Sequence, residues 1–279
     1  MMPQTPTTGA HRARPVREAP VGGRMTARLA GTLLLATLWL TGPAGAVTDP
    51  RTAPPIPPYT ASYEAHALGN TLNARMTLNH EDVQTRMAMD AHVSGFLRIL
   101  GRFELTRESL LNSRNGALQL VHSRSQQITP RRERKVETRF DWDINRAIGT
   151  INGDPFTLDV PPYTLDFLGS LYRMMQTLEG GELRQPGDHL EVQTLERDRL
   201  REYQFEYGGR ETMDSPIGRV ETIRIDRRSQ DSDVELSAWF ARELRHIPVR
   251  FDYEADGRVF ELNLTQLEWH DPIIDLTDE

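Results

Sequence analysis

Apolar and polar residues alternate along most of the chain between residues 59 and 269, and this alternation constrains the fold more than any other feature. Side chains of a β-strand point to opposite faces in turn, so a period of two predicts a strand. In residues 83–93, Met87 and Met89 fall on one face, whereas Arg86 and Asp90 fall on the other. Such segments predict strands that turn one face to a core and the other to water.

Turn residues divide the alternating segments at intervals typical of an antiparallel meander, without the spacing of βαβ units. The clearest turn is Asn115-Gly116, because both positions of a two-residue hairpin turn favour residues that tolerate positive φ. Strand twist accumulates across a sheet of this length, and open edges invite aggregation. The expected fold is therefore all-β and mainly antiparallel, with a strongly curved or closed β-barrel-like sheet of about eleven strands.

Two stretches indicate where strands should end or bend. The alternation of residues 147–151 runs into a turn at residues 152–155, and a helical segment follows without another expected strand. Residues 203–207 are expected to end at Gly208-Gly209, and the period slips by one residue within 220–225. That slip predicts a β-bulge, which adds one unpaired residue to a strand.

Residues 160–181 change to a helical period and interrupt the meander. Pro161-Pro162 keeps the chain extended before the helix, Thr164 is the expected N-cap, Asp166 suits the first turn, and Gly180-Gly181 can end the helix with positive φ. An apolar half-wheel needs a wall, so the helix should pack inside the curved sheet or close one end. The apolar half comprises Leu165, Phe167, Leu168, Leu171, Tyr172, Met174, Met175 and Leu178.

The N-terminal region predicts export. Residues 1–24 are a disordered or mis-annotated extension, so Met25 is an alternative start, and residues 25–46 have the charged, apolar and small-residue layout of a signal peptide ending at Ala44-Gly45-Ala46. An uncleaved anchor or a buried core helix is the alternative. Residues 47–58 form a Pro-rich linker, residues 59–270 the β domain, and residues 271–279 an acidic tail.

The absence of cysteine and the charge limit the cellular address and the partners. Without cysteine the exported chain has neither disulfides nor a lipidated residue, so we expect a soluble periplasmic protein that is not a lipoprotein and has no transmembrane anchor after signal cleavage. Residues 1–46 hold five of the 33 basic and one of the 40 acidic residues, so cleavage after Ala46 leaves a net charge of −11. Nucleic acid and anionic lipid headgroups are therefore not expected partners.

Motifs that would indicate an enzyme, a metal or a cofactor are missing from the sequence. It contains no G-x-S-x-G, H-E-x-x-H, Walker or G-x-G-x-x-G motif, so we assign no catalytic residue, metal ligand or cofactor. Strand pairing could bring His92 and His122 together as a metal site, although solvent-facing histidines are commoner. Asp141 and Asp143 share one strand face and could present two carboxylates, but an exposed polar face is the preferred explanation, because no partner acid or base is identifiable. The basic run 131–135 fits a solvated turn.

Methionine and aromatic residues at apolar positions are the main indication of a binding site. The flexible thioether of methionine suits surfaces that adapt to an irregular apolar ligand, such as an acyl chain. Core packing between helix and sheet is the simpler explanation of the same pattern. The candidate ligand-binding residues are Met87, Met89, Trp142, Phe167, Leu171, Met174 and Met175.

Six short strings occur in a fixed order at residues 59–63, 140–142, 162–172, 215–222, 239–242 and 247–251. Together they resemble the bacterial DUF3108 family, a domain of unknown function in exported proteins. The resemblance implies an all-β domain with an inserted helix and export across the inner membrane, and it brings no catalytic residues. Gly169 stands where the resemblance leads us to expect serine. The outline also resembles the lipoprotein carriers LolA and LolB, in which a curled sheet encloses a helix and an acyl chain; this likeness is one of shape only.

The leading hypothesis from the sequence is a non-enzymatic envelope protein whose curved sheet holds a hydrophobic ligand, such as a lipid, or a segment of an envelope protein. An alternative is a periplasmic hydrolase acting on an envelope glycan or lipid, with its site assembled from separate strands. A third is an assembly factor without a small ligand.

Overall fold

The computed structural model describes residues 55–67, 69–81, 83–95, 101–114, 117–228, 235–255 and 258–270. All of them belong to the unit Val47–Glu279. The predicted N-terminal extension, signal peptide and acidic tail lie outside the described residues, as do Asn115 and Gly116. The structure therefore describes the β domain and the end of the linker before it.

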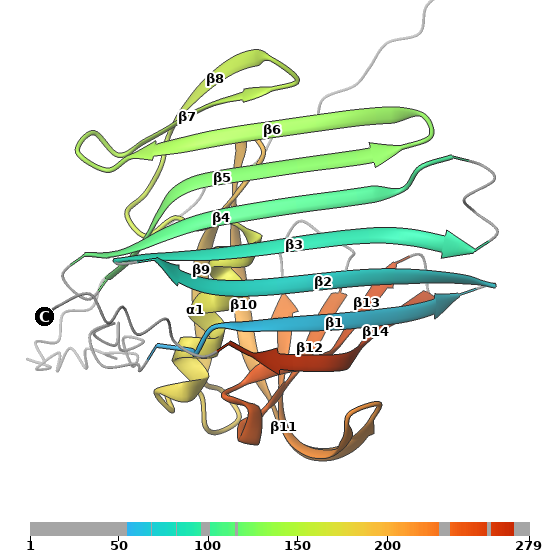
Figure 1. The fold of residues 1–279 in the computed structure, drawn as a ribbon. Coiled ribbons are helices and arrows are strands. Elements are labelled where there is room, and N and C mark those ends of the chain that lie inside the picture. The colour runs from blue at the N-terminus through green and yellow to red at the C-terminus, as the bar shows by residue number, and fades with distance from the viewer. Residues whose placement is uncertain are drawn as a thin grey trace, which may run out of the picture. The chain divides into compact units, whose positions relative to one another are not determined.

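The described strands form one antiparallel sheet of fourteen strands, built from two meanders (Figure 1). In the first meander each strand pairs with the next along the chain, because short turns join alternating segments. Strand β1 lies at the centre of the sheet and β8 at one end. The strands are β1 (Tyr59–Ala67), β2 (Asn70–Glu81), β3 (Gln84–Gly95), β4 (Glu104–Arg114), β5 (Ala117–Thr129), β6 (Arg132–Asp141), β7 (Arg146–Ile151) and β8 (Asp154–Asp159).

The second meander follows the helix and returns to the first strand. Its last strand pairs with β1 along Tyr59↔Trp269 to Glu64↔Asn263, which joins the two meanders into a single sheet. A short 3₁₀ helix, η3 (Arg242–Leu244), lies between two of its strands. The strands are β9 (His189–Glu196), β10 (Arg199–Ser215), β11 (Gly218–Arg228), β12 (Glu235–Ala241), β13 (Ile247–Ala255) and β14 (Arg258–Trp269).

Strand pairing leaves the sheet open between β8 and β9, and the segment before the helix partly covers the β9 edge. Leu165 forms a parallel bridge with Thr194: its N–H donates to Gln193 O at 2.9 Å, and its carbonyl accepts from Leu195 N at 2.7 Å. Open edge strands expose unpaired backbone groups, and this bridge satisfies two of them. The expected fold class is confirmed, with a sheet that is strongly curved rather than closed.

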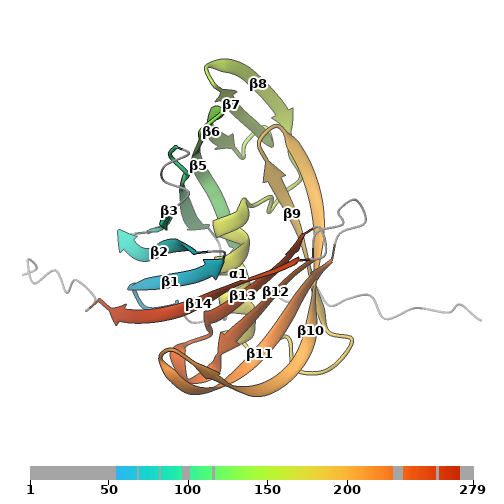
Figure 2. The same cartoon turned by 90° about the vertical axis from the view of Figure 1, so that its right-hand side faces the viewer.

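Helix α1 (Phe167–Glu179) lies on the concave side of the sheet and crosses the strands (Figures 1 and 2). Its N-cap is Asp166, whose carboxylate accepts from the N–H of Gly169, so the expectation of Thr164 as N-cap is wrong. The Thr164 hydroxyl instead donates to Pro161 O at 2.7 Å and closes the preceding turn. The chain leaves the helix through Gly181 at φ 68°, as the Gly-Gly pair predicts.

The helix and the inner faces of both meanders share one apolar core. Leu168, Met174 and Met175 of α1 are buried, together with Tyr59 and Tyr63 of β1. The Tyr63 hydroxyl donates to Pro248 O at 2.9 Å and so ties the first meander to the second. This packing confirms the predicted inner helix.

Three local features differ from the sequence-based expectations. The described residues form fourteen strands instead of about eleven, and the additional ones include β8, where Pro155 and the short length obscure the pattern. Strand β10 does not end at Gly208-Gly209, because a bulge between Tyr207 and Gly209 lets pairing with β11 continue. The bulge thus lies on β10, opposite the period slip of residues 220–225. Ile56 of the expected linker is fully buried, so the domain begins before Tyr59.

Candidate ligand-binding cavity

A cavity of about 850 Å³ occupies the part of the concave face that α1 does not fill. Its rim includes Asn70, Phe103 and Thr129, which lie at or beside the β1–β2, β3–β4 and β5–β6 connections. Its floor includes Asp166 and Phe167, at the N-terminus of α1. The cavity therefore runs between the inner faces of the two meanders, from the hairpin tips down to the start of the helix.

The walls are mostly apolar because the strand register aligns inward-facing hydrophobic residues. On the first meander Met76 pairs with Met89 and Leu72 with Val93. On the second, the pair Tyr253↔Phe260 stands at the mouth, where these side chains are 41% and 44% exposed. Further apolar lining comes from Ala65, Ala74, Ala91, Phe103, Leu105, Ile128, Val136, Leu195, Leu236, Phe251 and Leu262.

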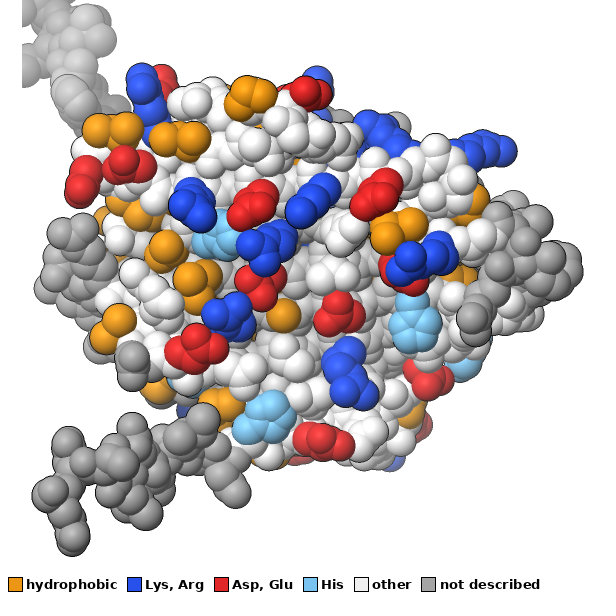
Figure 3. All heavy atoms as spheres, turned by 45° about the horizontal axis from the view of Figure 1, so that its top comes forward, with side chains coloured by type: hydrophobic (Ala, Val, Ile, Leu, Met, Phe, Trp, Pro, Cys, Tyr) orange, Lys and Arg blue, Asp and Glu red, His pale blue; other side chains and the backbone are white. Residues whose placement is uncertain are grey.

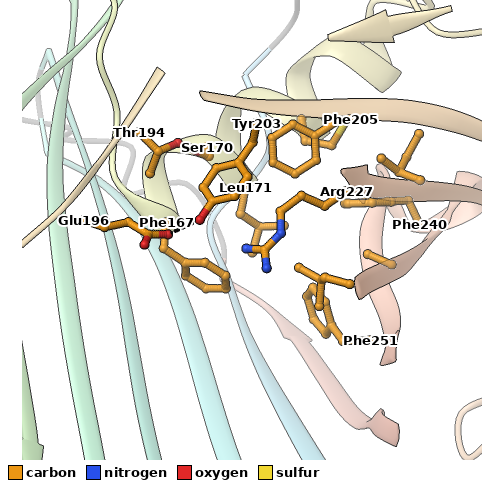
Figure 4. A pocket seen from close by; sticks show the side chains of 14 residues that line it. Phe167, Ser170, Leu171, Thr194, Glu196, Tyr203, Phe205, Arg227, Phe240 and Phe251 are labelled. Carbon is orange, nitrogen blue, oxygen red and sulfur yellow. Dashed lines mark hydrogen bonds between the residues drawn. The ribbon is translucent and has the colours of Figure 1, made fainter. Parts of the chain in front are cut away.

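A narrow cleft of about 50 Å³ lies between α1 and the second meander (Figure 4). Leu171 and Met174 line it from the helix, and Phe205 and Phe240 line it from the sheet. It adjoins the floor of the large cavity, since both are lined by Phe167, Glu196, Arg227, Leu236 and Phe251.

Asp166 joins the helix start to the first meander. Its Oδ1 accepts from Gly169 N at 2.8 Å, and its Oδ2 accepts from the hydroxyls of Ser109 at 2.5 Å and Ser123 at 2.6 Å. One oxygen of the carboxylate thus caps the helix while the other holds two strands by hydrogen bonds. These bonds position the cavity floor against β4 and β5.

Arg107 is the least satisfied charged group at the floor. It pairs with Met89 and follows Leu105 at period two, so β4 turns it inward. The guanidinium lies over the Phe167 ring at 4.7 Å, and its buried Nε has no hydrogen-bond partner among the described residues. Burial lowers the pKa of Arg107, and the negative charges of Asp166 and Glu196 partly offset this decrease through space. A buried, unpaired donor of this kind costs about 1–3 kcal/mol.

A second polar group lies beside the residues that line both the cavity and the cleft. Figure 4 shows its members Tyr203, Glu196 and Arg227 along the cleft. The Tyr203 hydroxyl donates to Glu196 Oε1 at 2.5 Å, and burial, followed by this hydrogen bond, raises the pKa of Tyr203 to about 12. The Arg227 guanidinium lies over the Tyr203 ring at 4.6 Å. Cation–π contact of this type holds the cation in place without neutralising it.

Comparison with protein families decides what kind of chain this is. The family described as "Protein of unknown function (DUF3108)" matches residues 59–262. The chain belongs to the DUF3108 family. The match spans β1 through the first five residues of β14 and confirms the resemblance inferred from the short strings.

Solved structures support the fold of the DUF3108 domain. A β-barrel-like protein of a domain of unknown function, DUF1849, from Brucella abortus is similar at a TM-score of 0.54 and 9% identity, over 78% of this chain and 99% of that one. A candidate lipoprotein from Parabacteroides distasonis ATCC 8503 aligns over 77% of this chain and 97% of its own at 10% identity, but its TM-score of 0.31 carries no argument. No curated protein matches the sequence significantly.

The DUF3108 domain brings four of the seven predicted ligand-binding residues to the cavity or the cleft. Met89 and Phe167 line the cavity, and Phe167, Leu171 and Met174 line the cleft. Met87 lies two residues further from the rim than Met89, where the helix covers the sheet, and it is fully buried in the core. Met175, on the helix, is fully buried as well.

Trp142 is the seventh predicted residue, and it does not line either space. Its indole N–H donates to Leu120 O at 2.8 Å, and its ring stacks on Phe140 with centroids 5.6 Å apart. These contacts give Trp142 a role in packing the end of β6.

The residues considered for metal binding or hydrolysis do not converge. His92 lies on β3 and His122 on β5 with β4 between them, and His122 Nε2 contacts Glu137 at 3.3 Å. Asp141 and Asp143 are exposed at the end of β6 far from the rim. Within the described part of the chain no group of three acids, histidines or cysteines is placed to hold a metal, and no helix is long and apolar enough to cross a membrane.

The visible outer face carries interspersed acidic and basic side chains rather than a patch of one sign (Figure 3). The basic run 131–135 mostly follows its expectation as a solvated turn, because Arg131, Arg132 and Lys135 are exposed. Arg134, however, is half-buried and lines the cavity. Sequence reasoning missed it, as it missed Arg107 and Arg227. The sequence did indicate that Arg107 faces inward, because it lies two residues after Leu105 and therefore on the same face of the strand.

Proposed function

We propose that this DUF3108 protein is a binding protein of the cell envelope that holds an apolar or amphiphilic ligand in its cavity. The observation that carries the proposal is the cavity of about 850 Å³ with predominantly apolar walls. Small-molecule sites typically occupy about 300–1,000 Å³, so the size suits a single ligand with an acyl chain.

The energetics favour an apolar occupant. Covering apolar surface contributes about 25 cal/mol for each Å² removed from water. The walls offer such surface continuously from the rim pair Tyr253↔Phe260 to Phe167 at the floor. Met76 and Met89 add flexible side chains that adapt to a chain of variable shape.

Periplasmic location is the second part of the proposal. Its support is the signal-like layout of residues 25–46 and the lack of any cysteine for lipidation. A binder with an apolar cavity is useful in this compartment because lipids and other amphiphiles cross it between two membranes.

Native mass spectrometry of the protein purified from periplasm tests the function. We expect a mass above that of the polypeptide, and organic extraction should release an amphiphile identifiable by its fragmentation. A preparation of the same protein stripped of ligand should take up added fatty acid or phospholipid. An apo species that takes up neither would refute the proposal.

A further inference from the structure

The charged residues lining the cavity differ in sign from the protein as a whole. Five arginines line it against three acids, whereas the full chain has a net charge of −7. Two of these eight charges have ion-pair partners outside the cavity lining: Arg124 contacts Glu137 at 3.3 Å, and Glu104 contacts Arg102 at 2.5 Å. The remaining charges are four arginines, Arg107, Arg134, Arg197 and Arg227, and two acids, Asp166 and Glu196.

Both acids are already committed to hydrogen bonds with neutral groups. Asp166 accepts from two serine hydroxyls and from the Gly169 amide, and Glu196 accepts from the Tyr203 hydroxyl. Neither acid forms a direct ion pair with Arg107; both act on its charge only through space. The cavity therefore presents cationic donors that lack a matching anion.

The four arginines line the same cavity, and their positive charges act on one another through space. Arg197 and Arg227 lower the pKa of Arg107, after burial, and Arg197 also lowers that of Arg134. They come from β4, β6, the β9–β10 turn and the end of β11, so both meanders contribute. Mutual repulsion of this kind is relieved when an anion enters.

We propose that the cavity binds an anionic amphiphile with its carboxylate or phosphate head at Arg107 and its acyl chain directed toward the rim. This inference rests on the proposed function and assigns the class of ligand. The free Nε and the planar guanidinium of Arg107 suit an oxyanion, which accepts its hydrogen bonds in a forked geometry. The chain then lies between Met76 and Met89 on one wall and Phe251 and Leu262 on the other.

The orientation follows from the position of Arg107 in its strand. Arg107 is three residues from Glu104, where β4 begins at the rim, which is about 10 Å at 3.4 Å per residue. A head group at that depth is removed from bulk water. A buried charge without a partner is strongly unfavourable, so the head group needs a cation at this position. The chain end then reaches the exposed aromatic pair Tyr253 and Phe260.

Isothermal titration calorimetry on the purified full-length protein with matched dodecyl ligands tests the inference. Dodecanoate and dodecyl phosphate should bind at least about ten times more tightly than 1-dodecanol, because charge-assisted hydrogen bonds are stronger than neutral ones. Arg107→Met should remove this preference while retaining dodecanol binding, which also shows that the variant keeps its cavity. Arg75→Met, an exposed arginine of β2 outside the cavity, is the matched control and should bind as the native protein does.

The alternative outcomes separate the inference from the proposed function. Equal binding of acid and alcohol, or an unchanged preference in Arg107→Met, would overturn the inference and leave a cavity that binds apolar chains. Binding of inorganic phosphate as tight as that of dodecyl phosphate would also overturn it, because the chain would then contribute nothing. Failure of every dodecyl compound to bind would refute the proposed function itself.

Discussion

Asp166 shows how one side chain can set both the helix and the cavity floor. It caps α1 through Gly169 and accepts from two serines on neighbouring strands. Its replacement by alanine removes an N-cap and leaves the Ser109 and Ser123 hydroxyls without an acceptor. We expect Asp166→Ala to lower the free energy of unfolding by about 2–4 kcal/mol, measured by urea denaturation.

The matched control for Asp166 is Asp143, an exposed aspartate in the turn after β6. Asp143→Ala should change the free energy of unfolding by less than about 0.5 kcal/mol, because it removes no buried hydrogen bond. An equal decrease in the free energy of unfolding in the two variants would contradict the inference that the hydrogen bonds of Asp166 hold the helix to the sheet.

Tyr203 gives a pH dependence that can be measured. Its pKa is about 12 in the folded protein against an ordinary value of 10.0, so between these values the folded state binds more protons than the unfolded state. The corresponding stability is fully present below pH 10 and is lost as pH rises toward 12. We expect Tyr203→Phe to unfold with a shallower decline over this range in urea titrations. Parallel declines for the two proteins would show that Tyr203 ionises equally in both states.

At the scale of elements, α1 is stable only because the sheet covers its apolar side. Leu168 is 1% exposed on that side, whereas Gln176 is partly exposed. Leu168→Ala should lower the free energy of unfolding by about 2–5 kcal/mol through lost burial and a residual cavity. Gln176→Ala should leave it unchanged within about 0.5 kcal/mol, and chemical denaturation followed by tryptophan fluorescence measures both. A small effect of Leu168→Ala would indicate a loosely packed helix.

The elements were predictable wherever periodicity and turn chemistry agreed. The inner helix, its Gly-Gly end and most strands follow from residue spacing. Strand β8 was missed because its six residues include Pro155, and β10 was expected to stop at Gly208-Gly209, a dipeptide that serves equally as a turn and as a bulge. The N-cap was misplaced because Thr164 and Asp166 both suit that position, and only pairing of Leu165 with β9 decides between them.

The candidate site was predictable only in its apolar part. Met89, Phe167, Leu171 and Met174 follow from the hydrophobic pattern. Met87 has the same pattern as Met89, but it lies under the helix, and the sequence does not show which strand positions the helix covers. The arginines were missed because an inward-facing charge breaks the pattern from which burial is inferred.

For the domain as a whole, the cavity is a consequence of how little of the sheet the helix covers. A strand of twelve residues extends for about 40 Å, whereas a helix that crosses it is about 10 Å wide. Helix α1 crosses near the strand ends that lie away from the rim (Figure 1), and the twist of the sheet brings the remaining inner faces opposite each other. The space between them is then lined by residues of both meanders.

A bulky side chain in that space should block ligand binding without weakening the fold. Ala91 lines the cavity from β3, and Ala88 on the same strand faces the other way. Ala91→Phe occupies empty volume rather than overfilling a packed core, so its free energy of unfolding should stay within about 1 kcal/mol of the native value. Its affinity for dodecanoate, measured by calorimetry, should fall about tenfold or more, which corresponds to at least about 1.4 kcal/mol. Ala88→Phe should bind dodecanoate normally, and native affinity in Ala91→Phe would mean that the acyl chain binds outside the cavity.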